Sequence, residues 1–273
     1  MLEINKIHQM DCLDGMKQLE DNSIDLVVTS PPYNINIDYG KDYSDNLPLE
    51  EYKKWILGVY KELFRVSKEK GLVCVNVGNQ RNSGLPHYTY FLLKEAGFNI
   101  IKEIFWYKGL YYIQGETIFI CCKGEEYNKY YPKNDGFYSN GQFATIWEMR
   151  YKNGESKKNL NHNAFFVKQL PRNCILINTK EGDLVLDPFS GTGTTALASK
   201  ELNRNYIGFE ISEEYLKVSN KRLSQETLFN SSPKWVKEMD KNHDIKQNVF
   251  VKYWEHFFNI TEDDLEAKED EGN

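Results

Sequence analysis

Short apolar runs alternate with amphipathic stretches along the first third of the chain. The apolar runs have the length and composition of buried strands, and they lie at residues 6–10, 24–29, 72–77 and 100–106. The amphipathic stretches repeat apolar side chains at helical spacing, and they lie at residues 13–19, 48–68 and 87–96. This alternation predicts an α/β fold with a mostly parallel, twisted sheet and helices on both faces.

The pattern changes after residue 106. Residues 107–160 are rich in Tyr, Asn, Gly and Lys and contain one convincing strand, at 117–121. Alternation then returns with strands at 183–187 and 206–210 and helices at 194–202 and 213–223. We therefore expect a main domain over residues 1–225 that contains 107–160 as an insertion, then an accessory helical segment at 226–260 and an acidic disordered tail at 261–273.

Composition and cysteine placement exclude several classes of protein. The chain is 40% hydrophobic, enough for a substantial core, but no apolar run approaches the roughly 20 residues that cross a bilayer. The first residues lack the pattern of a secretory signal. The five cysteines are scattered and form no C-x-x-C pair, which disfavours a disulfide framework and a zinc site. We expect a cytoplasmic protein with no metal and no contact with membranes.

The charge is unevenly distributed. The net charge is −6, and residues 261–273 carry seven acids and one lysine, so the remaining 260 residues are neutral overall. Within them, residues 150–172 carry six basic side chains against one acid. We call this group the basic island: Arg150, Lys152, Lys157, Lys158, Lys168 and Arg172. It could face a polyanion, although an ordinary solvated surface remains the alternative.

The strand at residues 24–29 runs directly into Ser30-Pro31-Pro32-Tyr33. Neither proline can donate to a sheet ladder and each fixes its own φ, so the chain leaves the sheet rigidly. The stretch predicts a stiff platform at the carboxyl end of a strand, presenting a hydroxyl, carbonyl groups and an aromatic ring. On this stretch alone, a simple strand-ending turn remains the alternative.

A second strand runs into a glycine turn and a helix at DPFSGTGTTA, residues 187–196, and Glu210 closes the next strand, 19 residues after Gly191. This is the spacing of a dinucleotide-binding turn with an acid placed for ribose hydroxyls. Asp187 changes the picture, because a carboxylate directly before the turn would repel a pyrophosphate and would suit a ligand with an ammonium or sulfonium group. S-adenosyl-L-methionine carries both groups and a ribose.

Together, TSPPYN and DPFSGTGTT resemble the motifs of the amino-group DNA methyltransferases, the bacterial enzymes that methylate cytosine N4 or adenine N6. The SPPY stretch precedes the glycine loop, which resembles the motif order called the beta class, and the likeness covers about residues 4–225. The resemblance implies a Rossmann-like methyltransferase fold for the main domain, S-adenosyl-L-methionine as the cofactor and double-stranded DNA as the partner.

The resemblance also implies roles for individual residues. Those of the SPPY stretch would be catalytic, namely Ser30, Pro31, Pro32 and Tyr33. Residues of the glycine loop, of the following strand end and of two further segments would bind the cofactor, namely Asp11, Cys12, Phe165, Asp187, Pro188, Phe189, Gly191, Thr192, Gly193 and Glu210. Asp11 and Cys12 match a segment near the cofactor's adenine, and Phe165 matches one that covers its methionine end.

These assignments predict a mechanism. An exocyclic amino nitrogen is a poor nucleophile, because its lone pair is delocalised into the ring, and it must become pyramidal as it attacks. The Ser30 hydroxyl and the Pro31 carbonyl would accept its N–H groups and favour that geometry. Tyr33 would present its ring to a base flipped out of the duplex. We therefore expect Tyr33→Phe to be milder than Tyr33→Ala, and Gly193→Val to block the cofactor while leaving the fold intact.

DNA contacts are expected outside the two motifs. The tyrosine-rich segment 107–160 is the candidate for target recognition, and Lys152, Lys157 and Lys158 of the basic island are the candidates for phosphate contacts. A surface insertion with ordinary aromatic packing is the alternative. Family members with serine at the first motif position more often methylate cytosine N4, so Ser30 favours cytosine, with adenine N6 as the alternative.

Other classes of protein remain as rivals. A nicotinamide-dependent oxidoreductase would use the glycine turn but would leave Asp187 and the SPPY stretch unexplained. A protein-glutamine methyltransferase would have its cofactor loop before the catalytic motif, opposite to the order here. A non-catalytic DNA-binding protein would not need both motifs. A companion restriction endonuclease that acts on the same DNA site without contacting this chain, and a homodimer, are compatible with the sequence but are not decided by it.

Overall fold

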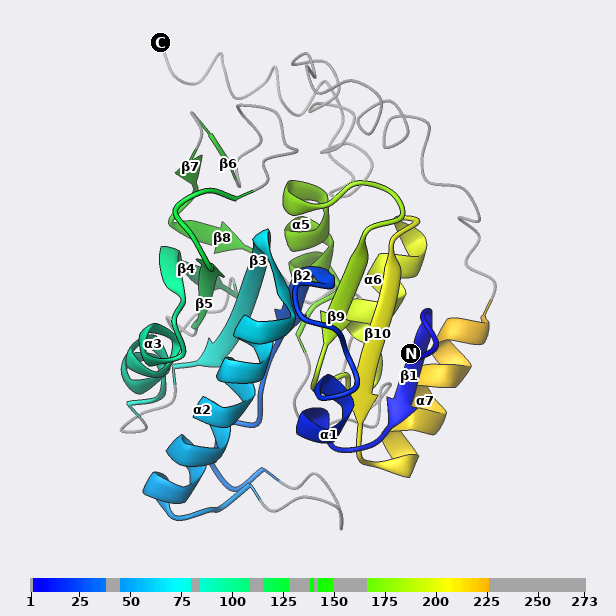
Figure 1. Ribbon diagram of the computed structural model, residues 1–273, viewed down its shortest axis with the longest axis horizontal. Coiled ribbons are helices and arrows are strands. Elements are labelled where there is room, and N and C mark those ends of the chain that lie inside the picture. The colour runs from blue at the N-terminus through cyan, green and yellow to red at the C-terminus, as the bar shows by residue number, and fades with distance from the viewer. Residues whose placement is uncertain are drawn as a thin grey trace.

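The computed structural model describes residues 2–37, 45–79, 84–108, 115–127, 138–139, 142–149 and 166–225. An eight-stranded sheet with the order β1-β10-β9-β2-β3-β5-β4-β8 forms the centre of the molecule (Figure 1). A separate two-stranded sheet joins β6 and β7. Among the described helices, none combines the length and the apolar character that a membrane span requires.

The elements follow the expected alternation closely. The strands are β1 (Lys6–Gln9), β2 (Ile24–Thr29), β3 (Ser67–Gly78), β4 (Asn99–Tyr107), β5 (Gly115–Cys122), β6 (Tyr138–Ser139), β7 (Gln142–Phe143), β8 (Ile146–Glu148), β9 (Leu184–Asp187) and β10 (Asn205–Glu210). The helices are α1 (Cys12–Met16), α2 (Leu49–Val66), α3 (Leu85–Glu95), α5 (Gln169–Asn178), α6 (Thr194–Glu201) and α7 (Glu213–Ser224).

Neighbouring strands of the large sheet run parallel except around β5, which is antiparallel to both β3 and β4. The prediction of a mostly parallel sheet is therefore confirmed. Strand β5 falls within the segment 107–160, yet it lies between two core strands. Strand β8 falls in the same segment and forms the edge of the sheet beside β4. Part of the predicted insertion is thus integral to the central sheet.

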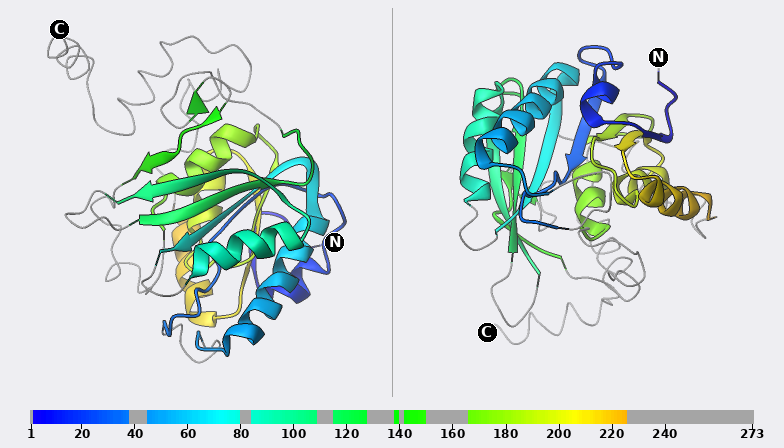
Figure 2. Two further views of the ribbon diagram at one scale, coloured as in Figure 1. Left: turned by 90° about the vertical axis from the view of Figure 1, so that its left-hand side faces the viewer. Right: turned by 90° about the horizontal axis from the view of Figure 1, so that it is seen from below.

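Helices cover both faces of the sheet, as predicted (Figures 1 and 2). Helices α1, α2 and α3 share one apolar cluster with side chains of β2 and β3, including Val27, Val73 and Val75. Helices α5 and α6 share another cluster with the alternate side chains of the same strands, including Leu26 and Cys74. Because successive side chains of a strand point to opposite faces, one apolar strand sequence supplies both clusters.

Helix α5 was not predicted from the sequence. Its residues, QLPRNCILIN, carry a proline at the third position, where a helix tolerates the missing N–H because the first turn has no partner for it. The run from Asn173 to Asn178 is buried throughout, so it shows none of the polar face by which a surface helix is recognised.

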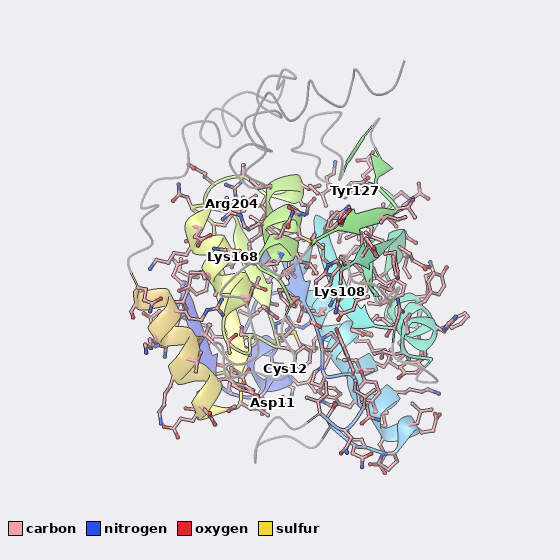
Figure 3. The ribbon with its side chains drawn as sticks, turned by 180° about the vertical axis from the view of Figure 1, so that it is seen from behind. Asp11, Cys12, Lys108, Tyr127, Lys168 and Arg204 are labelled. Atoms are coloured by element: carbon pink, nitrogen blue, oxygen red, sulfur yellow. The ribbon has the colours of Figure 1, made fainter. Side chains whose placement is uncertain are left out.

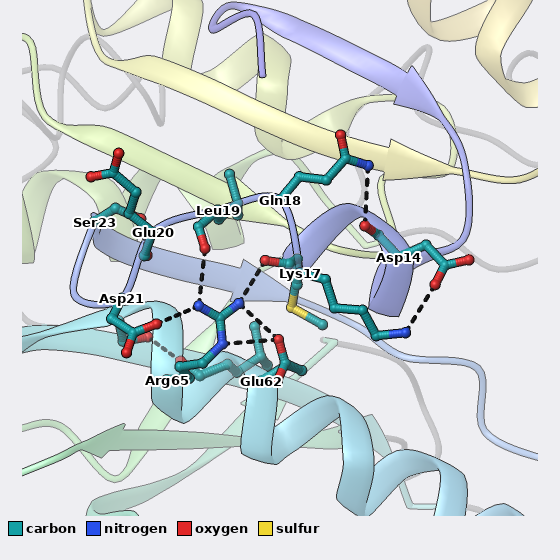
Figure 4. A network of polar contacts seen from close by, with 12 residues as sticks. Asp14, Lys17, Gln18, Leu19, Glu20, Asp21, Ser23, Glu62 and Arg65 are labelled. Atoms are coloured by element: carbon teal, nitrogen blue, oxygen red, sulfur yellow. Dashed lines mark hydrogen bonds and ion pairs between the residues drawn. The ribbon is translucent and has the colours of Figure 1, made fainter. Parts of the chain in front are cut away.

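Arg65, in the last turn of α2, fixes the position of α1 (Figure 4). Its guanidinium donates to the carbonyl of Met16 at 2.7 Å and to that of Leu19 at 2.9 Å. It also pairs with Asp21 at 2.6 Å and with Glu62 at 2.8 Å. These contacts satisfy carbonyls at the carboxyl end of α1 and tie that helix to α2.

The sheet order places a topological switch between β9 and β2, where the order in which the chain adds strands reverses. In open α/β sheets, ligands bind beyond the carboxyl ends of the strands at such a point. The carboxyl ends of β1, β10, β9, β2, β3 and β4 meet at one edge of this sheet, together with the amino end of the antiparallel β5. Both sequence motifs follow strands that end there.

Candidate active site

The two motifs meet at the switch point. Strands β2 and β9 are parallel neighbours, with Val27 opposite Leu186. At their ends, the Thr29 hydroxyl donates to the Asp187 carboxylate at 2.8 Å, although the two residues are 158 positions apart. A hydrogen bond therefore joins the start of the SPPY stretch to the start of the glycine loop.

The glycine loop is shaped by its own backbone. Gly191 and Gly193 have φ values of +49° and +77°, in the left-handed region that favours glycine. The backbone N–H of Phe189 donates to Asp187 at 3.1 Å, and the N–H of Gly193 donates to the carbonyl of Ser190 at 2.8 Å. The loop thus folds back on the carboxylate that precedes it.

Gly193 has a packing role in addition to its place in the loop. A Cβ at this position would lie 2.9 Å from the Cβ of Ser219 in α7 and 3.1 Å from Ile7 of β1. A valine would also need a positive φ, which β-branched residues rarely adopt. The expectation that Gly193→Val leaves the fold intact is therefore wrong, because the glycine lets α6 begin against α7 and β1.

Two carboxylates lie beside the loop. Asp187 is 3% exposed, and burial raises its pKa to about 6, although hydrogen bonds from Thr195 and Thr29 favour the ionised form. Burial also raises the pKa of Glu210, against hydrogen bonds from backbone N–H groups. One oxygen of Glu210 accepts from Gly191 and the other from Ser212, both at 2.8 Å. Each oxygen keeps a lone pair for a further donor.

The start of α1 lies beside Glu210. Gln9 of β1 pairs with Glu210 of β10, and the N–H of Met10 donates to the Glu210 carbonyl at 3.1 Å. Asp11 then caps α1 and accepts from the N–H of Leu13 at 2.8 Å. Asp11 is exposed, whereas Cys12 is buried, and burial raises the pKa of its thiol, which keeps it protonated. Figure 3 labels both residues.

The remaining predicted cofactor residues of the glycine loop pack against neighbouring helices or are buried. Pro188 is buried, and the ring of Phe189 packs against that of Trp55 with centroids 5.8 Å apart. Thr192 is 2% exposed, and its carbonyl and hydroxyl both accept from Arg222 of α7, at 2.5 and 3.0 Å. Thr192 therefore joins the loop to α7. Phe165, Lys152, Lys157 and Lys158 lie outside the described residues, so their proposed roles stay predictions.

The SPPY stretch forms a rigid corner. Pro31 is buried, and the hydroxyl of Tyr52 donates to the carbonyl of Pro32 at 2.8 Å. Tyr33 is only 8% exposed. Its ring lies against Gly78 of β3, where a Cβ would come within 2.8 Å of it. The ring is thus held from one side by the backbone of the neighbouring strand.

The chain that follows Tyr33 is anchored by Asp45. The Asp45 carboxylate, 3% exposed, accepts from the backbone N–H groups of Asn34, Ile35 and Ile37 at 2.7 to 3.0 Å. The side chain of Asn34 in turn bonds both backbone groups of Leu47. These contacts hold the exit from the SPPY stretch in place.

Side chains from three other places surround the hydroxyls of the SPPY stretch. The hydroxyls of Ser30 and Tyr33 are 2.8 Å apart. The Tyr33 hydroxyl donates to Glu116 of β5 at 3.2 Å, and Asn76 of β3 donates to the same carboxylate at 2.5 Å. Lys108, just after β4, pairs with the other oxygen of Glu116. Sequence reasoning missed Asn76, Glu116 and Lys108.

The missed residues carried only weak signals. Asn76 is the one polar residue in the buried part of β3, residues 71–78, and Glu116 stands at the beginning of β5. A polar side chain in a buried strand has to find partners, which is a hint of a site. Nothing in the sequence, however, indicates that these residues meet Ser30 and Tyr33, because their strand order is set by the tertiary fold.

Three comparisons relate the chain to known proteins. A family model described as DNA methylase, N6_N4_Mtase, matches residues 24–221, more than half of the chain. The type II methyltransferase M.BglII of Bacillus subtilis is 32% identical over 255 residues, which are 82% of this chain and 70% of that protein.

Solved structures share the architecture. PvuII DNA methyltransferase (cytosine-N4-specific) superposes with a TM-score of 0.67 at 23% identity, covering 87% of this chain and 92% of that one. A proposed DNA modification methylase of Thermus thermophilus, complexed with S-adenosyl-L-methionine, has a TM-score of 0.63 at 24% identity, covering 82% and 94% of the two chains. These likenesses confirm the predicted Rossmann-like α/β fold.

Proposed function

The chain belongs to the DNA methylase family of N4-cytosine and N6-adenine methyltransferases, and from this premise we propose that it methylates N4 of a cytosine flipped out of double-stranded DNA. S-adenosyl-L-methionine is the cofactor that this family implies. The observation that carries the proposal is the hydrogen bond between Thr29 and Asp187. It brings a cation-binding loop and an amino-group platform to one point of the sheet edge, as a transfer between two bound molecules requires.

The residues of the cofactor side fit S-adenosyl-L-methionine. A buried carboxylate with a raised pKa gains from a neighbouring positive charge, so Asp187 favours a ligand with an ammonium or sulfonium group. Glu210 stands at the end of the next strand, where its oxygens can accept from ribose hydroxyls. Asp11 lies next to that strand end and can face the adenine edge. The cofactor supplies an electrophilic methyl group.

The residues of the base side fit an amino group. The Ser30 hydroxyl and the Pro31 carbonyl accept the two N–H groups and draw the nitrogen out of conjugation with its ring. With the cofactor bound, the nitrogen would form a bond to the methyl carbon as the sulfur–carbon bond breaks, and its surplus proton would leave to solvent. The chain needs no residue that removes a proton before attack, because its contribution is positioning and acceptor placement.

The choice between cytosine and adenine is the finer part of the proposal. Both bases present an N–H₂ group, so the same acceptors serve either one. Serine at the first motif position favours cytosine N4, and adenine N6 is the second candidate. We propose in addition that segment 107–160 contributes to target recognition and that Lys152, Lys157 and Lys158 contact phosphates. A companion endonuclease for the same DNA site and a homodimer are further proposals.

The test is methylation of DNA by the purified chain. DNA incubated with the protein and S-adenosyl-L-methionine is digested to nucleosides, which are separated by mass. We expect N4-methyldeoxycytidine. A methyl group on deoxyadenosine would replace cytosine by adenine in the proposal, and a chain that methylates neither base would refute the function. Protein with Ser30→Ala serves as the matched control.

A further inference from the structure

We propose that Glu116 is a positioning residue that turns the Ser30 hydroxyl into a hydrogen-bond acceptor towards the target amino group, by fixing the direction of the hydrogen bonds that join Glu116, Tyr33 and Ser30. This inference rests on the proposed function. We call this chain of hydroxyl contacts the relay. Its ends are the Glu116 carboxylate of β5 and the Ser30 hydroxyl that follows β2.

The direction of the relay matters because a serine hydroxyl can act in two ways. If Ser30 donates its proton to the target nitrogen, it occupies the lone pair that has to attack. If Ser30 accepts from that nitrogen, it leaves the lone pair available and stabilises the positive charge that develops. Serine alone does not decide between the two, since its hydroxyl carries one proton and two lone pairs.

The Glu116 carboxylate fixes the direction of the hydrogen bonds in the relay. An ionised carboxylate only accepts, and a hydrogen bond to a charged group is about twice as strong as one between neutral groups. The Tyr33 hydroxyl therefore gives its single proton to Glu116, which lies 3.2 Å away. The Tyr33 oxygen is then left as an acceptor, so the Ser30 hydroxyl, 2.8 Å away, gives its own proton to Tyr33. The amide nitrogen of Asn76 lies 3.5 Å from the Ser30 oxygen as a donor, and the second lone pair of Ser30 remains for the target base.

Asn76 supports the same direction. Its amide nitrogen lies 2.5 Å from Glu116 and 3.2 Å from the Tyr33 hydroxyl, as a donor to both. The reverse amide orientation would put an oxygen 2.5 Å from a carboxylate oxygen, which is repulsive. Asn76 is 1% exposed, and its Oδ1 has no hydrogen-bond partner among the described residues. Such an orphaned acceptor costs free energy, so the donor contacts must outweigh it.

Lys108 supports the charge on Glu116. The two side chains form an ion pair and are only 15% and 16% exposed. The Lys108 ammonium also stands 4.5 Å above the centre of the fully buried Trp106 ring, which limits its movement. The ammonium therefore stays beside the Glu116 carboxylate as its charged partner. Figure 3 shows Lys108 near the middle of that view.

The experiment measures single-turnover methyl transfer to DNA and, separately, the affinity for S-adenosyl-L-methionine. Glu116→Gln keeps the shape of the side chain but adds a donor, so the relay loses its fixed direction. We expect the rate constant of transfer to fall at least about tenfold, with cofactor affinity unchanged. Glu103→Gln, which removes an exposed carboxylate from β4 of the same sheet, should transfer at the wild-type rate.

A double-mutant cycle separates the relay from a general loss of structure. Because Glu116 acts only through the Ser30 hydroxyl, Ser30→Ala combined with Glu116→Gln should be no slower than Ser30→Ala alone. If Glu116→Gln fails to fold, Tyr33→Phe breaks the relay one link further on and enters the same cycle. Additive losses, or a wild-type rate in the single variant, would overturn the relay. A wild-type chain that transfers no methyl group to DNA would instead overturn the proposed function.

Discussion

The two halves of the candidate site are built in different ways. The cofactor half uses one short loop, whose glycines take positive φ values and whose backbone N–H groups hold the carboxylates of Asp187 and Glu210. The base half uses side chains that meet one another across several strands, since Ser30 and Tyr33 contact Asn76 and Glu116. A backbone-built site depends on local conformation, whereas a side-chain-built site depends on how strands are ordered.

This difference predicts how each half responds to substitution. In the base half, a changed side chain alters the chemistry but leaves the loop of the cofactor half untouched. In the cofactor half, a changed glycine alters the backbone and with it the fold. The hydrogen bond between Thr29 and Asp187 joins the two motifs directly.

The largest expected effect lies in the base half. Ser30→Ala and Tyr33→Ala should each lower the rate of methyl transfer by about 10² to 10³-fold, because each removes a group that contacts the target base. Isothermal titration with S-adenosyl-L-methionine should show little change in affinity. Tyr33→Phe should be milder than Tyr33→Ala but not silent, since its hydroxyl belongs to the relay. Loss of cofactor binding in these variants would show that the halves are not separate.

Gly193→Val tests the cofactor half as a structural element. The added side chain requires a positive φ and meets Ser219 and Ile7, so we expect the free energy of unfolding to fall by about 3 kcal/mol. Thermal or denaturant unfolding measures this. Gly58→Ala in α2 is the matched control, because a Cβ there meets nothing within 4 Å and should stabilise the helix by up to about 1 kcal/mol. If Gly193→Val is as stable as the wild type but does not bind S-adenosyl-L-methionine, the glycine serves only to make room for the ligand.

The pH dependence of cofactor binding tests the charge of Asp187. Its pKa in the folded chain is about 6, above the ordinary value of 3.8. A cationic ligand prefers the ionised form, so the affinity should weaken by up to about tenfold per pH unit as the pH falls below 6. Titration calorimetry between pH 5 and pH 8 measures the slope. In Asp187→Asn the affinity should be lower at pH 8 and nearly independent of pH.

The same raised pKa has the opposite sign for stability without ligand. Because the folded chain holds the Asp187 proton more tightly than the unfolded chain, this group stabilises the fold below its ordinary pKa. That contribution is lost as the pH rises through about 6. Glu210, whose pKa burial also raises, acts in the same direction. The free energy of unfolding of the unliganded wild type should therefore fall as the pH rises through about 6, and this fall should be smaller in Asp187→Asn. Denaturant unfolding of both chains across this pH range measures the difference.

The smallest effect on methyl transfer is expected from lysines that lie outside both halves of the site. Replacing Lys152, Lys157 and Lys158 with glutamine should weaken binding to all duplexes alike and flatten the slope of log affinity against log salt. The slope should change by roughly one unit for each lost phosphate contact. The rate of transfer at saturating DNA should stay the same. An unchanged slope would show that these lysines contact no phosphates and belong to an ordinary solvated surface.

Much of the fold was predictable because its signals are local. Apolar alternation placed β2 over Ile24–Thr29, the bounds that the structure has, and it placed most other elements within a few residues. Helix α5 escaped because burial on all sides removes the polar face. Strand β8 escaped because three residues are too few for a pattern. The antiparallel course of β5 escaped because direction is a property of pairing and leaves no periodicity.

The sequence by itself determined the α/β class, the two motifs and the cofactor half. A strand, a glycine turn, a helix and a following acid are all encoded within 27 consecutive residues, from Leu184 to Glu210. Only the tertiary structure decided that Thr29 meets Asp187, that Gly193 packs α6 against α7, and that Glu116 directs the hydroxyl of Ser30. The physical reason is the strand order. Residues 40 to 158 positions apart become neighbours only when β9 and β3 flank β2 and β5 pairs with β3.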